Sequence, residues 1–168
     1  MGKNKIIIVD ENDNQIGLAD KIEAHTTKPQ LHRAITCFLK NEKGEYLITK
    51  RAKTKLLWPE IWETTCSTHP NENESYEACT ERRLKEELDI DTKVKLKDKF
   101  VYRAPYKNIG SENEVCALLV GGISGPVNPN KNEIADYKFV NLEELQEDIK
   151  NHPKLYAPWL ETALKKLG

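Results

Sequence analysis

Three histidines and two glutamates of this chain could together bind a divalent metal ion. His25 and His32 bracket a short loop, and His69 follows much later in the sequence. Glu112 and Glu114 stand two residues apart, so both carboxylates face the same side if their segment is a strand. Imidazole nitrogens and carboxylate oxygens, without a thiolate, suit Mn²⁺ or Zn²⁺. Considered singly, each histidine is typical of a surface residue, and the two glutamates favour an acidic loop.

A basic cluster could bind phosphate. Lys50, Arg51, Lys53 and Lys55 lie within six residues and form the densest group of cations in the chain. An arginine offers a fork of donors to oxyanions and a lysine offers a mobile point charge. The alternative interpretation is a solvated loop.

The charged stretch 74–88 is predicted to be a helix. Glu74 would begin it, where an acid suits the positive end of the helix dipole. Leu84 and Leu88 then fall on one face, and Arg83 lies beside Glu87 because residues four apart are neighbours on a helix. Without further context this pattern is typical of a solvated helix with surface ion pairs.

Further strands and helices must position these side chains. Strands are predicted at 5–10, 34–39, 46–50, 93–106, 115–120 and 137–140, a hairpin turn at 41–44, a loop at 121–132, and helices at 142–150 and from about Pro158. The segment Trp62 to Pro70 would lead from the sheet into the charged helix. Alternating helices and strands of this kind predict an α/β (α+β) fold.

Composition limits the possible partners. With 168 residues, the chain is expected to form a single domain, 1–168, that buries its own core. The net charge of -1 gives no global attraction to nucleic acid or to a membrane surface. The four cysteines form no C-x-x-C pair, and no apolar run is long enough for a signal peptide or a membrane span. We therefore expect a reduced, cytoplasmic protein that is a monomer or weak dimer.

The charged helix carries a recognisable spacing. The pattern is Thr68-x5-Glu74-x7-Arg82-Arg83-Leu84-x-Glu86-Glu87-x-Asp89-Ile90, which resembles the Nudix box G-x5-E-x7-R-E-U-x-E-E-x-G-U, where U is aliphatic. Thr68 and Asp89 replace the two glycines, and Arg83 replaces the first glutamate after the arginine. Nudix hydrolases use the carboxylates of this helix to gather metal around a pyrophosphate. The loss of one carboxylate therefore argues against hydrolysis.

The same departure resembles one Nudix branch, the type 1 isopentenyl-diphosphate isomerases. The similar segments extend over nearly the whole chain: His25-Thr26, Leu31-His32, Lys50-Arg51-Ala52-x-x-Lys55, Trp58-Pro59-x-x-Trp62, His69-Pro70, Tyr102-Arg103-Ala104, Glu112 to Cys116 and Pro158-Trp159. The resemblance implies a Nudix-type mixed β-sheet sandwiched between α-helices. It also implies metal-dependent isomerisation of a small isoprenyl diphosphate, isopentenyl to dimethylallyl diphosphate, in isoprenoid biosynthesis.

The resemblance implies a role for each candidate residue. It places Mn²⁺ or Zn²⁺ among His25, His32, His69, Glu112 and Glu114, and a second ion, Mg²⁺, at Glu87 and the substrate diphosphate. It assigns the diphosphate contacts to Lys21, Arg51, Lys55 and Arg83. Glu114 and Tyr102 match the proton-transfer pair on the metal side, and Trp159 matches the aromatic partner of the carbocation.

One catalytic position departs from the family. The family motif places a cysteine where this chain has Ser67, and Cys66, one residue earlier, would point to the opposite face of a strand. A thiol exchanges protons near neutrality, whereas an alcohol is a far weaker acid and needs a partner base. Three alternatives follow: slow isomerisation, a water held by Ser67, or a local bulge that turns Cys66 into the site. Two other functions also stay open, a Nudix diphosphohydrolase acting on a prenyl or nucleoside diphosphate and a prenyl-diphosphate binder without turnover.

Overall fold

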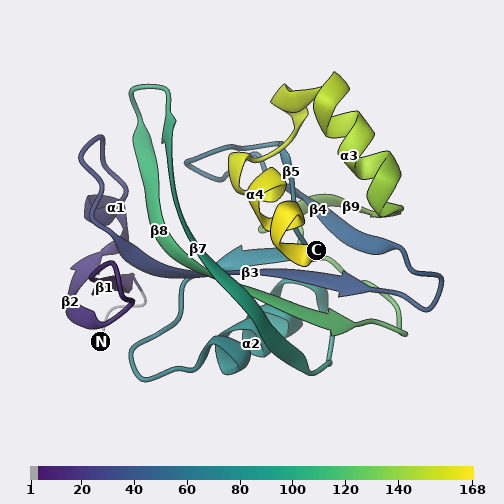
Figure 1. Ribbon diagram of the computed structural model, residues 1–168, viewed down its shortest axis with the longest axis horizontal. Helices are drawn as coiled ribbons and strands as arrows, with labels where there is room; N and C mark the ends of the chain where they lie inside the picture. The colour runs from purple at the N-terminus through teal and green to yellow at the C-terminus, as the bar shows by residue number, and fades with distance from the viewer. Residues whose placement is uncertain (1–3) are drawn as a thin grey trace.

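The computed structural model describes residues 4–168, and a nine-stranded sheet forms its centre (Figure 1). The strands are β1 Lys5–Val9, β2 Gln15–Asp20, β3 His32–Lys40, β4 Tyr46–Arg51, β5 Trp62–Glu63, β6 Cys66–Thr68, β7 Val94–Tyr106, β8 Gly110–Gly122 and β9 Ile134–Val140. The helices are α1 Lys21–Ala24, α2 Tyr76–Leu88, α3 Leu142–Asn151 and α4 Pro158–Leu167, with a 3₁₀ turn, η1, at Pro153–Leu155.

The sheet is mixed and is built around β3. Strand β8 pairs with β3 in parallel over nine residues, from His32 opposite Glu114 to Lys40 opposite Gly122. Strands β1, β6 and β4 pair with β3 in antiparallel orientation, β7 pairs with β8, and β9 pairs with β4. The parallel pair joins two strands that are about eighty residues apart in the chain, and it brings the start of β3 beside the middle of β8.

Helices cover both faces of this sheet. Helix α2 lies on one side, and α3 and α4 lie on the other (Figure 1). Leu84 and Leu88 of α2 are fully buried, in one core cluster with residues of β3 and β8. Burying each such side chain contributes roughly 1.5 to 3 kcal/mol. The predicted sandwich of a mixed sheet between helices is therefore confirmed.

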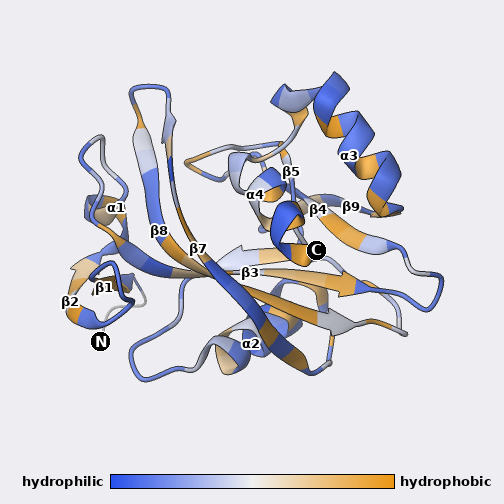
Figure 2. Ribbon diagram, viewed as in Figure 1, coloured by the Kyte–Doolittle hydropathy of each residue, from blue (hydrophilic) through white to orange (hydrophobic). Residues whose placement is uncertain are grey.

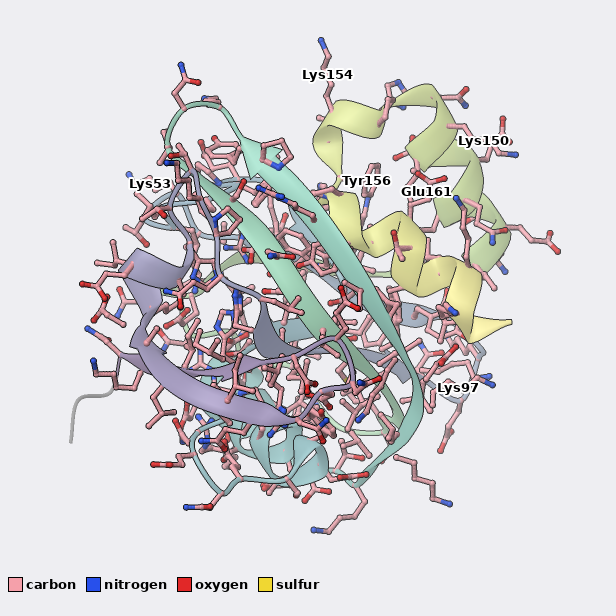
Figure 3. The ribbon with its side chains drawn as sticks, turned by 60° about the vertical axis from the view of Figure 1, so that its left-hand side comes forward. Lys53, Lys97, Lys150, Lys154, Tyr156 and Glu161 are labelled. Carbon is pink, nitrogen blue, oxygen red and sulfur yellow. The ribbon has the colours of Figure 1, made fainter. Side chains whose placement is uncertain are left out.

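The second core cluster lies under the C-terminal helices. Phe38 of β3 and Leu118 of β8 belong to it with Leu145 of α3 and Leu160 of α4. Figure 2 shows the same division, with hydrophobic residues along the strands and polar residues on the outer sides of the helices. Charged residues of this region, such as Lys150, point away from the body of the molecule (Figure 3). Both faces of the sheet are thus closed by apolar packing.

Several element boundaries differ from those expected. The predicted helix 74–88 begins at Tyr76, because the Ser75 hydroxyl accepts a hydrogen bond from the Ala78 N–H at 3.1 Å and acts as N-cap. Glu74 precedes the cap and accepts hydrogen bonds from Arg82 at 2.7 and 2.9 Å. Strand β8 begins at Gly110 and β9 at Ile134, so both are longer than predicted and the loop between them is shorter. The acidic-loop interpretation of Glu112 and Glu114 is therefore wrong.

Candidate active site

The five candidate metal ligands converge at one end of the sheet, as the sequence predicted. His25 is the C-cap of α1, His32 begins β3, His69 follows β6, and Glu112 and Glu114 lie on β8. One ligand atom from each of these side chains lies within 4.8 Å of the others. All are buried except His69, which is partly buried. Segments spanning about ninety residues thus supply one compact group of nitrogen and oxygen donors.

Two backbone features position this group. The parallel pairing of β3 with β8 places His32 opposite Glu114. At the start of β8, the Ser111 N–H donates a hydrogen bond to the His25 carbonyl at 2.9 Å. A Cβ atom at Gly110 would lie 2.4 Å from that carbonyl oxygen, so the close approach requires glycine. Strand β8 can therefore pass directly over His25 and present Glu112 to it.

The donor chemistry of this group fits a divalent cation. The Nδ1 atoms of His25 and His32 lie 2.6 and 2.8 Å from backbone carbonyls, which only accept hydrogen bonds. Each neutral ring thus carries its proton on Nδ1 and directs the Nε2 lone pair inward. The Nε2 atom of His25 lies 3.1 Å from Oε2 of Glu112, a buried oxygen with no hydrogen-bond donor among the described residues. Acceptors that face one another in this way are what a metal ion brings together.

The ionisation of the two glutamates is consistent with this arrangement. Burial raises the pKa of Glu114, but the interactions of its carboxylate with His32, Glu112 and Tyr102 together outweigh this effect and lower the pKa to about 2. Burial and the charge of Glu114 raise the pKa of Glu112. Burial lowers the pKa of His25, but the adjacent Glu112 carboxylate, the Lys21 carbonyl and the charge of Glu114 together outweigh this effect and leave the pKa raised. Burial and the neighbouring carboxylate thus disfavour the ionised form of Glu112, a cost that a bound cation would offset.

A cavity of about 330 Å³ opens beside this group. Its wall includes the four cations predicted to contact a diphosphate, Lys21, Arg51, Lys55 and Arg83. Burial of its ammonium group and the nearby charge of Lys55 lower the pKa of Lys21, which reflects the crowding of positive groups there. Lys53 belongs to the same basic run but points to the surface (Figure 3). Only part of the basic cluster therefore faces the cavity.

Arg51 also has a structural role that the sequence did not indicate. Its guanidinium donates to the carbonyl oxygens of Leu57 and Trp58, each at 3.0 Å, and to Glu63 at 3.0 Å. Trp58 has φ of 48°, a left-handed conformation that is unfavourable for a residue with a large side chain. Arg51 thus holds the loop after β4 in place while it lines the cavity.

Ser67 faces the cavity and Cys66 does not. Strand β6 pairs with β3 in continuous register, Thr36 opposite Ser67 and Cys37 opposite Cys66. Cys66 lies in the core cluster beneath α2, where burial raises the pKa of its thiol well above the ordinary value. The alternative that a bulge turns Cys66 into the site is therefore wrong.

Two threonines surround the Ser67 hydroxyl. Its Oγ lies 2.9 Å from the hydroxyl oxygens of both Thr36 and Thr64, and these two oxygens are 2.7 Å apart. Thr64 also donates to the Cys66 carbonyl at 3.2 Å. Among the described residues, no carboxylate or imidazole is hydrogen-bonded to Ser67. The serine is thus oriented by hydroxyl groups and has no partner base.

Aromatic side chains complete the cavity. The Tyr102 hydroxyl donates to Oε2 of Glu114 at 2.5 Å, and burial together with the Glu114 charge raises the pKa of Tyr102 well above its usual value. The Trp159 indole N–H donates to Glu63 at 3.2 Å, and its ring meets Trp58 edge to face at 5.4 Å between centroids. The site therefore has one fixed electron-rich wall and one phenol that stays protonated.

Glu87, the remaining predicted residue, is buried near the end of α2. Its Oε1 lies 2.5 Å from Nη2 of Arg83, which confirms the predicted pair four residues apart. Burial raises the pKa of Glu87, although the charge of Arg83 acts in the opposite direction. This carboxylate does not line the cavity, whereas its partner Arg83 does.

Several residues near the cavity were missed by the sequence analysis. They are Thr36, Thr64, Glu63, Cys116 and Glu133, which contact the predicted residues or line the cavity. Cys116 follows Glu114 by two residues on the same face of β8, a spacing that could have identified it. The two threonines and Glu133 carry no comparable signal in the sequence.

Comparison with known proteins identifies the family of this chain. A model of the NUDIX domain family matches residues 30–162. Isopentenyl-diphosphate Delta-isomerase 1 of Photorhabdus laumondii is 38% identical over 158 residues, which cover 93% of this chain and 90% of that protein. The chain belongs to the type 1 isopentenyl-diphosphate isomerase family. An isopentenyl-diphosphate Delta-isomerase of Haloarcula marismortui is 35% identical over 174 residues, covering 98% of this chain and 91% of that protein.

The fold agrees with a solved structure as well. A crystal structure of a Deinococcus radiodurans protein superposes on this member of the isomerase family with a TM-score of 0.79. The match covers 98% of this chain and 99% of that chain, at 17% sequence identity. At such low identity the likeness concerns the fold alone. Within residues 4–168, none of the helices is both long and apolar enough to cross a bilayer.

Proposed function

We propose that this protein converts isopentenyl diphosphate to dimethylallyl diphosphate, the activity named for its relatives. The observation that carries the proposal is the set of side chains that line one cavity. Four cations, a compact group of metal-ligand side chains and an aromatic wall all border the same space. This combination suits a substrate with an anionic head and a small hydrocarbon tail.

The diphosphate would bind at the cations. Lys21, Arg51, Lys55 and Arg83 supply charge-assisted hydrogen bonds to its oxygens. Mg²⁺ would accompany the diphosphate beside Glu87, in keeping with the preference of this ion for carboxylate and phosphate oxygens. Arg83 stands where a Nudix hydrolase has a metal-binding glutamate, and it faces the cavity. It would therefore bind substrate rather than gather metal for hydrolysis.

The double bond moves when a proton is added at one carbon and another is removed two carbons away, through a tertiary carbocation. Mn²⁺ or Zn²⁺ held by His25, His32, His69, Glu112 and Glu114 would supply the positive charge that orients Glu114. Tyr102 and Glu114 would exchange a proton with one end of the reacting group, since the Tyr102 hydroxyl already donates to Glu114. Trp159 would stabilise the carbocation with its ring face, by about 0.5 to 2 kcal/mol.

Ser67 would serve the other proton transfer. Its hydroxyl faces the cavity and is held by Thr36 and Thr64, so it can position a water molecule. An alcohol without a partner base transfers protons slowly. We therefore propose slow isomerisation with a water held by Ser67.

A product assay in deuterated water tests the function. With isopentenyl diphosphate, Mg²⁺ and Mn²⁺ or Zn²⁺ present, proton NMR should detect dimethylallyl diphosphate that carries deuterium from the solvent. Release of phosphate or diphosphate would instead identify a hydrolase. Saturable binding without any product would identify a binding protein.

We also propose the setting in which the enzyme works. A single domain, 1–168, would act in the cytoplasm as a monomer or weak dimer, without a nucleic-acid or membrane partner. The four cysteines are free and buried, as expected for a reduced protein. Size-exclusion chromatography with light scattering measures the oligomeric state.

A further inference from the structure

Glu133 is fixed between the two segments that supply Lys55 and Arg83. Its N–H donates to the Asn130 carbonyl at 2.9 Å, and its carbonyl accepts from the Ala52 N–H at 3.1 Å. The Asn130 N–H in turn donates to the Glu87 carbonyl at 2.7 Å. The loop before β9 is therefore attached both to the segment after β4 and to the end of α2.

The Glu133 carboxylate interacts with both cations. Its Oε2 forms an ion pair with Nζ of Lys55 and lies 3.6 Å from Nη2 of Arg83. Burial raises the pKa of Glu133, but its hydrogen bond with Lys55 and the positive charges of Lys55 and Arg83 together outweigh this effect and leave the pKa lowered. Glu133 is therefore ionised at neutral pH.

A second carboxylate shares the same guanidinium nitrogen. Nη2 of Arg83 lies 2.5 Å from Oε1 of Glu87 and 3.6 Å from Oε2 of Glu133, so the two oxygens are at most about 6 Å apart. Lys55 and Arg83 line the cavity, whereas neither carboxylate does. Two of the four cations predicted to bind diphosphate, Lys55 and Arg83, are thus already paired with carboxylates that lie outside the cavity wall.

This arrangement should give free diphosphate a lower affinity than Mg²⁺-bound diphosphate. A free diphosphate would meet neutralised cations and the repulsion of two carboxylates close behind them. A diphosphate bound to Mg²⁺ brings less negative charge and adds a cation that carboxylates favour.

We propose that Glu133 is a specificity-determining residue that makes diphosphate binding conditional on Mg²⁺. The inference rests on the proposed function, because it takes the ligand to be a prenyl diphosphate. Glu133 acts through Lys55 and Arg83 and is not a group that touches the reacting carbons.

Binding measurements on Glu133→Gln test the inference. The probe is isopentyl diphosphate, the saturated analogue that cannot be isomerised, titrated by calorimetry with and without Mg²⁺. The protein is first loaded with Zn²⁺ at the three-histidine group and freed of excess metal. In Glu133→Gln, affinity for the metal-free probe should rise roughly threefold to tenfold at low ionic strength. This is the range expected when one unit charge is removed about 6 Å from an anion in surroundings of high dielectric constant. The gain in affinity from Mg²⁺ should shrink by the same factor.

Glu86→Gln is the matched control. The Glu86 carboxylate lies 2.6 Å from Nη1 of the same Arg83, but its side chain is 46% exposed. Because solvent screens this charge, both affinities should change by less than about twofold. Circular dichroism establishes that both variants fold.

Each outcome decides the matter. If Glu133→Gln weakens binding equally with and without Mg²⁺, then Glu133 merely holds the cations in place and the inference is overturned. Unchanged affinities, or the same change in Glu86→Gln, overturn it as well. If the parent protein binds no isopentyl diphosphate under either condition, the proposed function fails together with the inference. If the parent binds isopentyl diphosphate but the affinities of Glu133→Gln do not change as expected, only the inference fails.

Discussion

Replacement of Ser67 by cysteine should increase the rate of isomerisation substantially. Ser67 lies at the cavity position where this chain departs from its family, and Tyr102, Glu114 and Trp159 line the same cavity. Its Oγ contacts Thr36 and Thr64 at 2.9 Å each, and neither hydroxyl can act as a base near neutral pH. A thiol, with a reference pKa of about 8.5, can give and accept a proton without such help.

The changes in rate and in stability can both be estimated. A well-placed acid or base contributes typically about 10² to 10⁴ in rate, which corresponds to about 2.7 to 5.5 kcal/mol of barrier. Sulfur is larger than oxygen and a weaker hydrogen-bond partner, so the two bonds to the threonines would weaken. At roughly 0.5 to 1.5 kcal/mol per bond, the free energy of unfolding should fall by about 1 to 3 kcal/mol. The variant should therefore be faster and slightly less stable.

Initial rates of three proteins provide the assay: the parent, Ser67→Cys and Cys66→Ala. Cys66→Ala should change the rate by less than about twofold, because its side chain lies in the core under α2, where truncation mainly lowers stability by about 1 kcal/mol. Native mass spectrometry verifies equal metal content, and urea unfolding gives the stability.

Two results would refute this reasoning. A folded Ser67→Cys protein with normal metal content and no increase in rate means that the cavity is not built for isomerisation. An inactive Cys66→Ala protein beside an active parent means that the wrong residue of the pair was assigned to the cavity.

Further predictions concern substrate binding, stability and metal. Lys55→Ala should weaken binding of isopentyl diphosphate with Mg²⁺ tenfold or more, because a charge-assisted hydrogen bond is worth roughly 1.5 to 3 kcal/mol; unchanged affinity in calorimetry would contradict it. The same loss is expected for Arg51→Ala, but with a lower melting temperature, since Arg51 also holds the Trp58 loop. Asp13 accepts hydrogen bonds from Arg33, Lys99 and Tyr76, and although burial raises its pKa, these partners leave the pKa below 3.8 in the folded protein. The stabilisation by Asp13 is therefore present at neutral pH and lost as the pH falls below about 4. Asp13→Asn should have a lower free energy of unfolding at pH 7, and this free energy, measured by urea unfolding, should fall less steeply than that of the parent as the pH is lowered. Removal of metal by a chelator should lower the melting temperature by several degrees, with recovery on adding Zn²⁺ or Mn²⁺, and calorimetry of His25→Ala should show no such response.

Much of the fold could be predicted from local patterns. Segments such as 5–10 and 34–39 are strands because their short, nearly continuous apolar runs can be buried on both faces of a sheet. The helix ending at Leu88 follows from its leucine spacing, although its first residue does not, because Ser75 and Glu74 compete as the residue that begins it. Strand β8 extends well beyond its apolar part, because pairing with β3 and β7 continues through the polar residues from Gly110.

The sequence by itself determined which side chains are the candidate metal ligands and cations, and it revealed the departure at Ser67, because these depend on residue type and order. Only the tertiary structure decided their surroundings. The parallel register of β3 and β8 places His32 beside Glu114, and Gly110 lets β8 approach His25. The placement of Glu133 between Lys55 and Arg83 depends on contacts between residues 50 to 78 positions apart in the chain. Such contacts arise from strand register and loop attachment, which depend on packing of the whole sheet and leave no periodic signal in a local stretch of sequence.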